Sequence, residues 1–109
     1  MGRYNIPVEA TLEAIGGKWK VVILCLLAKG AKRTSELKRA MPAITQKMLT
    51  QQLRELEADN IITRNVYQQI PPRVEYDLTE YGKTLSKVLD VMCEWGESHI
   101  ENQLRKIVE

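Results

Sequence analysis

The segment from Thr45 to about Asp59 combines a regular spacing of leucines with a set of polar and basic side chains. Leu49, Leu53 and Leu56 recur at the spacing of one helical face, which predicts a helix with a buried stripe. The opposite face would present the polar residues Gln46, Lys47, Thr50, Gln51 and Arg54. Side chains of these types can bind adenine, guanine, thymine or phosphate at the major groove. The sequence therefore predicts a recognition helix, although the same residues could form an ordinary solvated face.

Position along this helix divides its polar residues into two roles. The first turns of a recognition helix lie nearest the base edges, so we expect the first four polar residues to contact bases and Arg54 to contact the backbone. Thr45 is expected to cap the helix and to lie beside the DNA. The acidic residues at the far end, Glu55, Glu57 and Asp59, would repel phosphates. Only the N-terminal half is therefore expected to enter the groove.

Residues that precede and follow this helix in the sequence could hold the DNA backbone. Thr34, Ser35 and Lys38, near the start of a preceding short helix, offer hydroxyls and a positive charge to phosphates. Gln69 and Arg73 flank a diprolyl tip, where Arg73 would suit the minor groove. Arg73 could instead pair with a carboxylate across a hairpin.

Basic residues are concentrated in the same part of the chain. Residues 29–54 carry seven Lys and Arg against one Glu, a net charge of +6. Residues 75–109 carry four basic against eight acidic residues, a net charge of −4. A basic middle segment favours contact with a polyanion, although a solvated helical face can carry such a bias by chance.

The remaining residues argue against an enzyme, a metal site or a bound cofactor. The sequence has no Gly-rich phosphate loop and no Cys/His cluster, and His99 is its one histidine. Cys25 and Cys93 form no CxxC pair, which favours a reducing compartment. Cys25 is expected to be an inert core thiol, whereas Cys93 could be solvent-accessible or lie close to its mate in a dimer.

Composition favours one globular domain spanning residues 1–109. Apolar residues make up 44% of the 109 residues and charged residues 28%, which is ordinary for a folded chain. The longest apolar run, Val21–Ala28, is too short to span a bilayer, and the first residues lack the apolar stretch of a signal peptide. We therefore expect a cytoplasmic protein with no membrane partner.

Short helices are predicted ahead of the recognition helix. They are Pro7–Ile15, Lys18–Lys29 and Glu36–Met41. The second is apolar around most of its circumference, as expected for the central helix of a small bundle. Thr34 or Ser35 would cap the third, and Pro42 would close it. This third helix, a tight turn and the recognition helix form a helix-turn-helix pattern.

A β-hairpin is predicted directly after the recognition helix. Ile62–Tyr67 has strand character, and Val74–Leu78 alternates apolar and polar residues. Two prolines between these strands make a stiff tip. Thr79 would cap one last, long helix. The predicted fold class is mainly α with a small β-hairpin wing (α+β), a winged helix-turn-helix.

An apolar stripe on the last helix predicts contact with a second copy of the chain. The stripe comprises Leu85, Val88, Leu89, Met92 and Trp95. Val8 and Leu12 of the first helix could pack against it. Since a chain of this size gains most by burying such a stripe against another copy, we expect a homodimer formed through the terminal helices.

Blocks spread over nearly the whole chain carry a family resemblance. They are Pro7–Leu12, Ile15–Lys20, Met48–Glu57, Pro71–Thr79 and Trp95. Together they resemble HxlR-type regulators, a branch of the MarR-like winged-helix proteins. The resemblance implies a homodimer whose two winged helices read a roughly palindromic operator. The chain departs from the family at Ile6, where several members that sense thiol-reactive compounds have a Cys, so that redox switch is not expected here.

These features predict a sequence-specific transcriptional regulator that binds double-stranded DNA as a homodimer and acts as a repressor. A cavity between the last helices and the winged body could hold a small-molecule effector. The alternative is a winged helix used for protein contacts alone. The overlap of the basic segment with the helix-turn-helix favours DNA.

Overall fold

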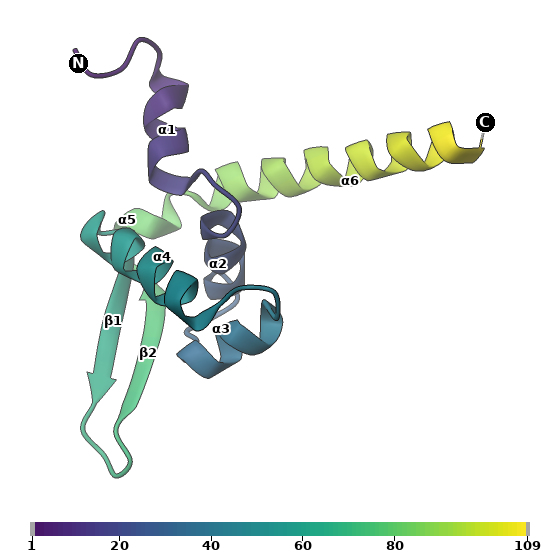
Figure 1. Ribbon diagram of the computed structural model, residues 1–109. Coiled ribbons are helices and arrows are strands. Elements are labelled where there is room, and N and C mark those ends of the chain that lie inside the picture. Colours follow the sequence, from purple (N-terminus) through teal and green to yellow (C-terminus); the bar gives the residue numbers. More distant parts are fainter. Residues whose placement is uncertain (1, 109) are drawn as a thin grey trace.

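The computed structural model describes residues 2–108, which form a winged helix-turn-helix (Figure 1). The elements, in chain order, are α1 (Pro7–Ile15), α2 (Lys20–Leu27), α3 (Thr34–Ala40), α4 (Gln46–Ala58), β1 (Ile62–Tyr67), β2 (Arg73–Leu78), α5 (Glu80–Lys83) and α6 (Ser86–Val108). The predicted class, mainly α with a small hairpin, is confirmed. The hairpin and α6 both project from the body that α2, α3 and α4 form (Figure 1).

The core is aliphatic and includes side chains from α2, α3, α4 and the base of the hairpin. The α2 side chains in it are at most 1% exposed, and they are Ile23, Leu24 and Leu27. On α4, Leu49, Leu53 and Leu56 are at most 2% exposed, as their spacing predicts. Each such burial stabilises the fold by about 1.5–3 kcal/mol. This burial turns the opposite, polar face of α4 toward solvent.

The caps of the two helices of the helix-turn-helix differ from each other. Thr45 caps α4 as predicted, because its Oγ1 accepts a 3.0 Å hydrogen bond from a backbone N–H of the first turn. The prediction that Thr34 or Ser35 caps α3 is wrong, because the N-cap residue is Arg33. The Glu36 carboxylate accepts a 2.8 Å hydrogen bond from the Arg33 backbone N–H. This bond occupies an amide at the helix start without a hydroxyl cap.

The wing is anchored by an isolated β-bridge that the sequence does not reveal. β1 pairs antiparallel with β2, with Ile62 opposite Leu78 at the base. On the other side of β2, Lys32 and Tyr76 exchange two backbone hydrogen bonds of 2.9 and 2.8 Å. These bonds tie the loop before α3 to the hairpin, so the wing and the helix-turn-helix are held together.

The prediction of one long helix after Thr79 is wrong, because the segment divides into α5 and α6. Thr79 caps only α5, where its Oγ1 accepts a 2.8 Å hydrogen bond from a backbone N–H. The hydroxyls of Thr84 and Ser86 donate to backbone carbonyls of α5 at 2.5 and 2.8 Å. Such local side-chain bonds compete with a continuing helix. Leu85, at the break, packs against the core.

Most of α6 extends away from the body (Figure 1). Within this helix only Leu89 is buried. The radius of gyration of 16.2 Å exceeds the value of about 13 Å expected for a compact chain of this length. None of the helices in residues 2–108 combines the length and apolarity that crossing a membrane requires.

Gly82 provides a test of the junction between α5 and the base of the wing. A Cβ at this position would collide with the backbone carbonyl of Ile61, which cannot move as freely as a side chain. We expect Gly82→Ala to lower the free energy of unfolding by about 1–3 kcal/mol, measured by urea denaturation. Gly96→Ala is the control, because a Cβ there meets no heavy atom within 4 Å. An equal loss in both variants would contradict this account of the junction.

Candidate nucleic-acid interface

The polar face of α4 forms one open groove at the surface. Its lining comprises Gln46, Lys47, Thr50, Gln51, Arg54 and Glu55. All five polar residues predicted for this face therefore lie together, with Glu55 beside them. Thr50 is half-buried and the other four are exposed. Thr45 lies at the start of the same helix, where its hydroxyl makes the cap.

A buried lysine beneath the groove is the main feature that the sequence prediction missed. The Lys20 side chain is 9% exposed, and its Nζ lies 2.8 Å from Oε1 of Glu55. The Nε2 of Gln51 donates a 3.2 Å hydrogen bond to the other carboxylate oxygen, Oε2. Hydrogen bonds from Lys20 and then from Gln51 hold the pKa of Glu55 below its ordinary value. The carboxylate thus links the core to a residue predicted to read bases.

This network changes the expectation for Glu55. The sequence predicts that Glu55 repels phosphates, but its charge is paired with that of Lys20. A signal was available, because Lys20 precedes the buried Ile23 and Leu24 by three and four residues and so shares their helical face. A lysine on a buried face requires a partner.

The residues predicted to hold phosphates on α3 lie at its start and middle. Thr34 and Ser35 are in the first turn, half-buried and exposed respectively. The Nζ of Lys38 donates a 3.2 Å hydrogen bond to the carbonyl of Pro42, in the turn that leads into α4. Lys38 therefore braces the turn between the two helices.

On the wing, Arg73 packs against the hairpin itself. Its guanidinium lies 4.8 Å from the centre of the Tyr67 ring. Its Nε lies 3.4 Å from a carboxylate oxygen of Glu75, without the geometry of a hydrogen bond. The carboxylate partner is on the same strand rather than across the hairpin. Gln69 lies at the exposed tip, and the exposed Arg64 on β1 adds a cation that the sequence prediction omitted.

The residues predicted for a dimer interface fall into two groups. Leu89 is 5% exposed and Leu85 is half-buried, because both pack in the core of their own chain. The other five are exposed large apolar side chains: Val8 51%, Leu12 61%, Val88 39%, Met92 47% and Trp95 67%. The ring of Trp95 stacks on that of His99 with centroids 5.0 Å apart.

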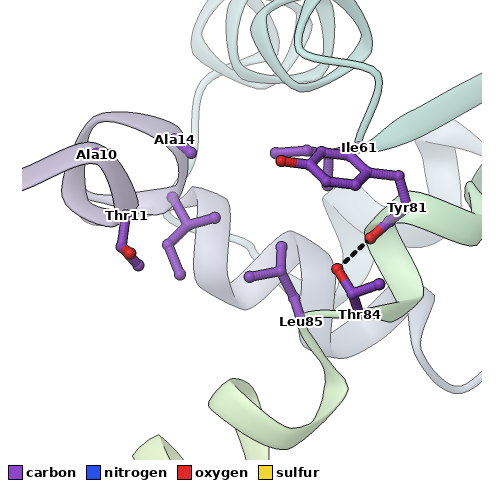
Figure 2. Close-up of a pocket in the computed structure, with 8 residues that line it drawn as sticks. Ala10, Thr11, Ala14, Ile61, Tyr81, Thr84 and Leu85 are labelled. Atoms are coloured by element: carbon purple, nitrogen blue, oxygen red, sulfur yellow. Dashed lines mark hydrogen bonds between the residues drawn. The ribbon is translucent and has the colours of Figure 1, made fainter. Parts of the chain in front are cut away.

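A small cavity lies between α1 and α5, where the last helices meet the winged body (Figure 2). Its volume is about 190 Å³, below the roughly 300 Å³ at which ligand pockets usually begin. Thr11, Tyr81 and Thr84 supply the hydroxyl-bearing side chains of its lining. Binding of a small-molecule effector in this cavity remains a prediction. Across residues 2–108 no cluster of three or more His, Cys, Asp or Glu is arranged to hold a metal.

The helix-turn-helix, the hairpin beside it and the polar groove on α4 define a winged helix-turn-helix protein. The family model for the HxlR-like helix-turn-helix matches residues 14–104. The chain belongs to this family, and the resemblance found in the sequence is confirmed.

Related proteins point to the same class. The HTH-type transcriptional regulator YtcD of Bacillus subtilis is 70% identical over 98 residues, covering 90% of this chain and 78% of the relative. The redox regulator HypR in its reduced form superposes with a TM-score of 0.87 at 53% identity, covering 92% of this chain and 99% of that one. A MarR-family transcriptional regulator from Enterococcus faecalis V583 gives 0.78 at 42% identity, covering 90% and 89%. The chain is a transcriptional regulator of the helix-turn-helix type.

The link between Lys20 and Glu55 can be tested by titration. In the wild type, the pKa of Glu55 lies below the ordinary 4.5. The ion pair therefore stabilises the fold above that pH and is lost as the pH falls through the pKa of the folded state. Lys20→Met should raise the pKa of Glu55 toward its ordinary value, measured by NMR of the side-chain carboxyl. Lys18→Met is the control, because this exposed lysine lies over the Trp19 ring instead and should leave Glu55 unchanged. A Glu55 pKa that is the same in wild type and Lys20→Met would contradict the link.

Proposed function

We propose that this regulator binds a palindromic operator as a homodimer and represses transcription. The observation that carries the proposal is the groove on α4, because side chains suited to bases and phosphates share it. Five of the six residues that line the groove also lie in the 29–54 segment of net charge +6. A dimer seated on an operator that overlaps a promoter would exclude RNA polymerase.

In this proposal the N-terminal half of α4 enters the major groove. Gln46, Lys47, Thr50 and Gln51 then face base edges, and Arg54 contacts a phosphate. The Glu55 carboxylate holds the Gln51 amide before DNA arrives, so less side-chain freedom is lost on binding. The amide nitrogen of Gln51 has two N–H donors, so one can stay on Glu55 while the other and the amide oxygen form the bidentate contact with adenine.

The remaining contacts of the proposal lie on either side of α4. Thr34, Ser35 and Lys38 face the phosphates beside the major groove, and Thr45 lies at the point of entry. Gln69 at the wing tip and Arg73 behind it approach the adjacent minor groove. Arg73 would release Glu75 to reach it, so its contribution is smaller than that of a free arginine.

The second copy is proposed to dock on the terminal helices. The exposed side chains of Val88, Met92 and Trp95 on α6, and of Val8 and Leu12 on α1, need an apolar partner. A helix that projects from the body gains stability mainly from packing, which a second α6 would supply. Such a dimer would set its two α4 helices about one DNA turn apart, roughly 34–36 Å, or a multiple of it.

Replacing Gln51 tests whether α4 reads bases. We expect Gln51→Ala to weaken binding to the cognate operator by about 1–3 kcal/mol and to weaken binding to random DNA less, measured by fluorescence anisotropy. Gln52→Ala is the matched control, because this neighbouring glutamine is half-buried, bonds to the Met48 sulfur and does not line the groove. An equal loss on both DNAs would remove Gln51 from the base-reading set.

Replacing Trp95 tests the dimer. A carboxylate in the middle of a buried apolar interface would lose its hydration, so Trp95→Asp should shift the protein from dimer to monomer at micromolar concentration. Sedimentation velocity would measure the shift. Ile70→Asp is the control, because Ile70 at the wing tip is fully exposed and lies on a different element. A Trp95→Asp protein that remains dimeric would place the interface elsewhere.

A further inference from the structure

The two cysteines of the chain lie side by side although 68 positions separate Cys25 from Cys93 in the sequence. Cys25 is on α2 and Cys93 on α6, and both thiols line both of the hollows beside the α2–α6 contact. One of these hollows is also bounded by Lys29 and Asp90, and the other mainly by apolar side chains. The fold has therefore paired two thiols from different elements at its surface.

The two thiols differ in access. Cys93 is exposed, whereas Cys25 is half-buried and packs against the core. Burial raises the pKa of the Cys25 thiol, and the neighbouring Cys93 raises it further. Cys93 follows the buried Leu89 by four residues and so lies on the side of α6 that faces the body. Trp95, the last residue of the proposed dimer stripe, follows Cys93 by two positions and so lies on a different side of α6, whereas Met92 of the same stripe lines the apolar hollow with both thiols.

We propose that Cys25 and Cys93 form a reversible disulfide within one chain when the protein meets a peroxide. The Cys93 sulfur attacks one oxygen of hydrogen peroxide, the O–O bond breaks, and Cys93 becomes a sulfenic acid while water leaves. The Cys25 sulfur then attacks the Cys93 sulfur, the S–O bond breaks and a second water leaves. Two thiols and one peroxide give one disulfide and two waters, and a small-molecule dithiol restores the thiols.

Such a bond would act on the long arm of α6. A disulfide holds its two sulfur atoms about 2.05 Å apart and the Cα atoms of its residues within about 7 Å, so it fixes the position of α6 against α2. From Cys93 to Val108 the helix continues for about 22 Å at its usual rise, which turns a small tilt into a larger displacement. This part of the inference rests on the proposed function, because the arm would hold the partner copy. The bond then changes the spacing of the two α4 helices and weakens operator binding.

The first measurement concerns the thiols alone. Purified wild-type protein is treated with hydrogen peroxide, and its free thiols are counted before peptide mapping by mass spectrometry. We expect no free thiol, a chain that runs as a monomer on a non-reducing gel, and a Cys25–Cys93 cross-linked peptide. Cys25→Ala and Cys93→Ser are the controls, and neither should yield an intrachain cross-link. A disulfide between two chains, or Cys93 oxidised to a sulfinic acid beside a free Cys25, would overturn the proposal.

The second measurement concerns DNA. Oxidised wild type should bind its operator roughly 5- to 150-fold more weakly than reduced wild type, with full recovery after dithiothreitol. Both cysteine variants should keep the same affinity with and without peroxide. If the cross-linked protein bound the operator with unchanged affinity, the proposed effect of the disulfide on DNA binding through α6 would be overturned. The disulfide itself would stand. If the reduced protein bound no DNA, the proposed function would fail, and the thiol count would still decide whether the disulfide forms.

Discussion

Three leucines on one face of α4 determine how this helix lies on the body. Leu49, Leu53 and Leu56 are almost fully removed from solvent in the core. Rotating α4 about its axis would expose them at a cost of about 1.5–3 kcal/mol for each side chain. The helix therefore presents one face to solvent, and the groove with its polar lining is on that face. The same packing that stabilises the domain aims the side chains with which we propose it reads DNA.

Core and groove are further connected by charge. Lys20 lies in the buried layer, where an unpaired ammonium would be costly, and the Glu55 carboxylate 2.8 Å away compensates it. Because Glu55 also accepts a hydrogen bond from Gln51, a residue on α2 influences the position of a side chain on the DNA-facing surface. Glu55 lies in a groove proposed to bind DNA, where a free carboxylate would repel phosphates. Because its charge is paired with that of Lys20, this repulsion is reduced.

The sequence predicted the elements whose signals are local. Leucine spacing revealed α4, Thr45 revealed its cap, and the alternation in 74–78 revealed the second strand. The five polar residues of α4 were found in the same way, because periodicity alone assigns them to one face. Whether they contact DNA is a separate question that packing does not answer.

Features that depend on residues far apart in the sequence were missed. The pairing of Lys32 with Tyr76, the ion pair of Lys20 and the meeting of the two cysteines arise only when the chain has folded. The division after α5 was also missed, because the type of a residue does not show whether its hydroxyl will bond to a backbone carbonyl, as those of Thr84 and Ser86 do here. Leu85 and Leu89 fitted an apolar stripe, but periodicity does not distinguish a stripe that faces the protein's own core from one that faces a partner.

Hydroxyl-radical footprinting would show whether two copies of α4 read DNA together, as we propose. The DNA would be a genomic fragment that the purified wild-type protein retains. We expect two protected segments related by a dyad, with their centres roughly 34–36 Å apart along the helix axis or a multiple of that distance. A single protected segment without a dyad, or uniform protection of the whole fragment, would contradict it.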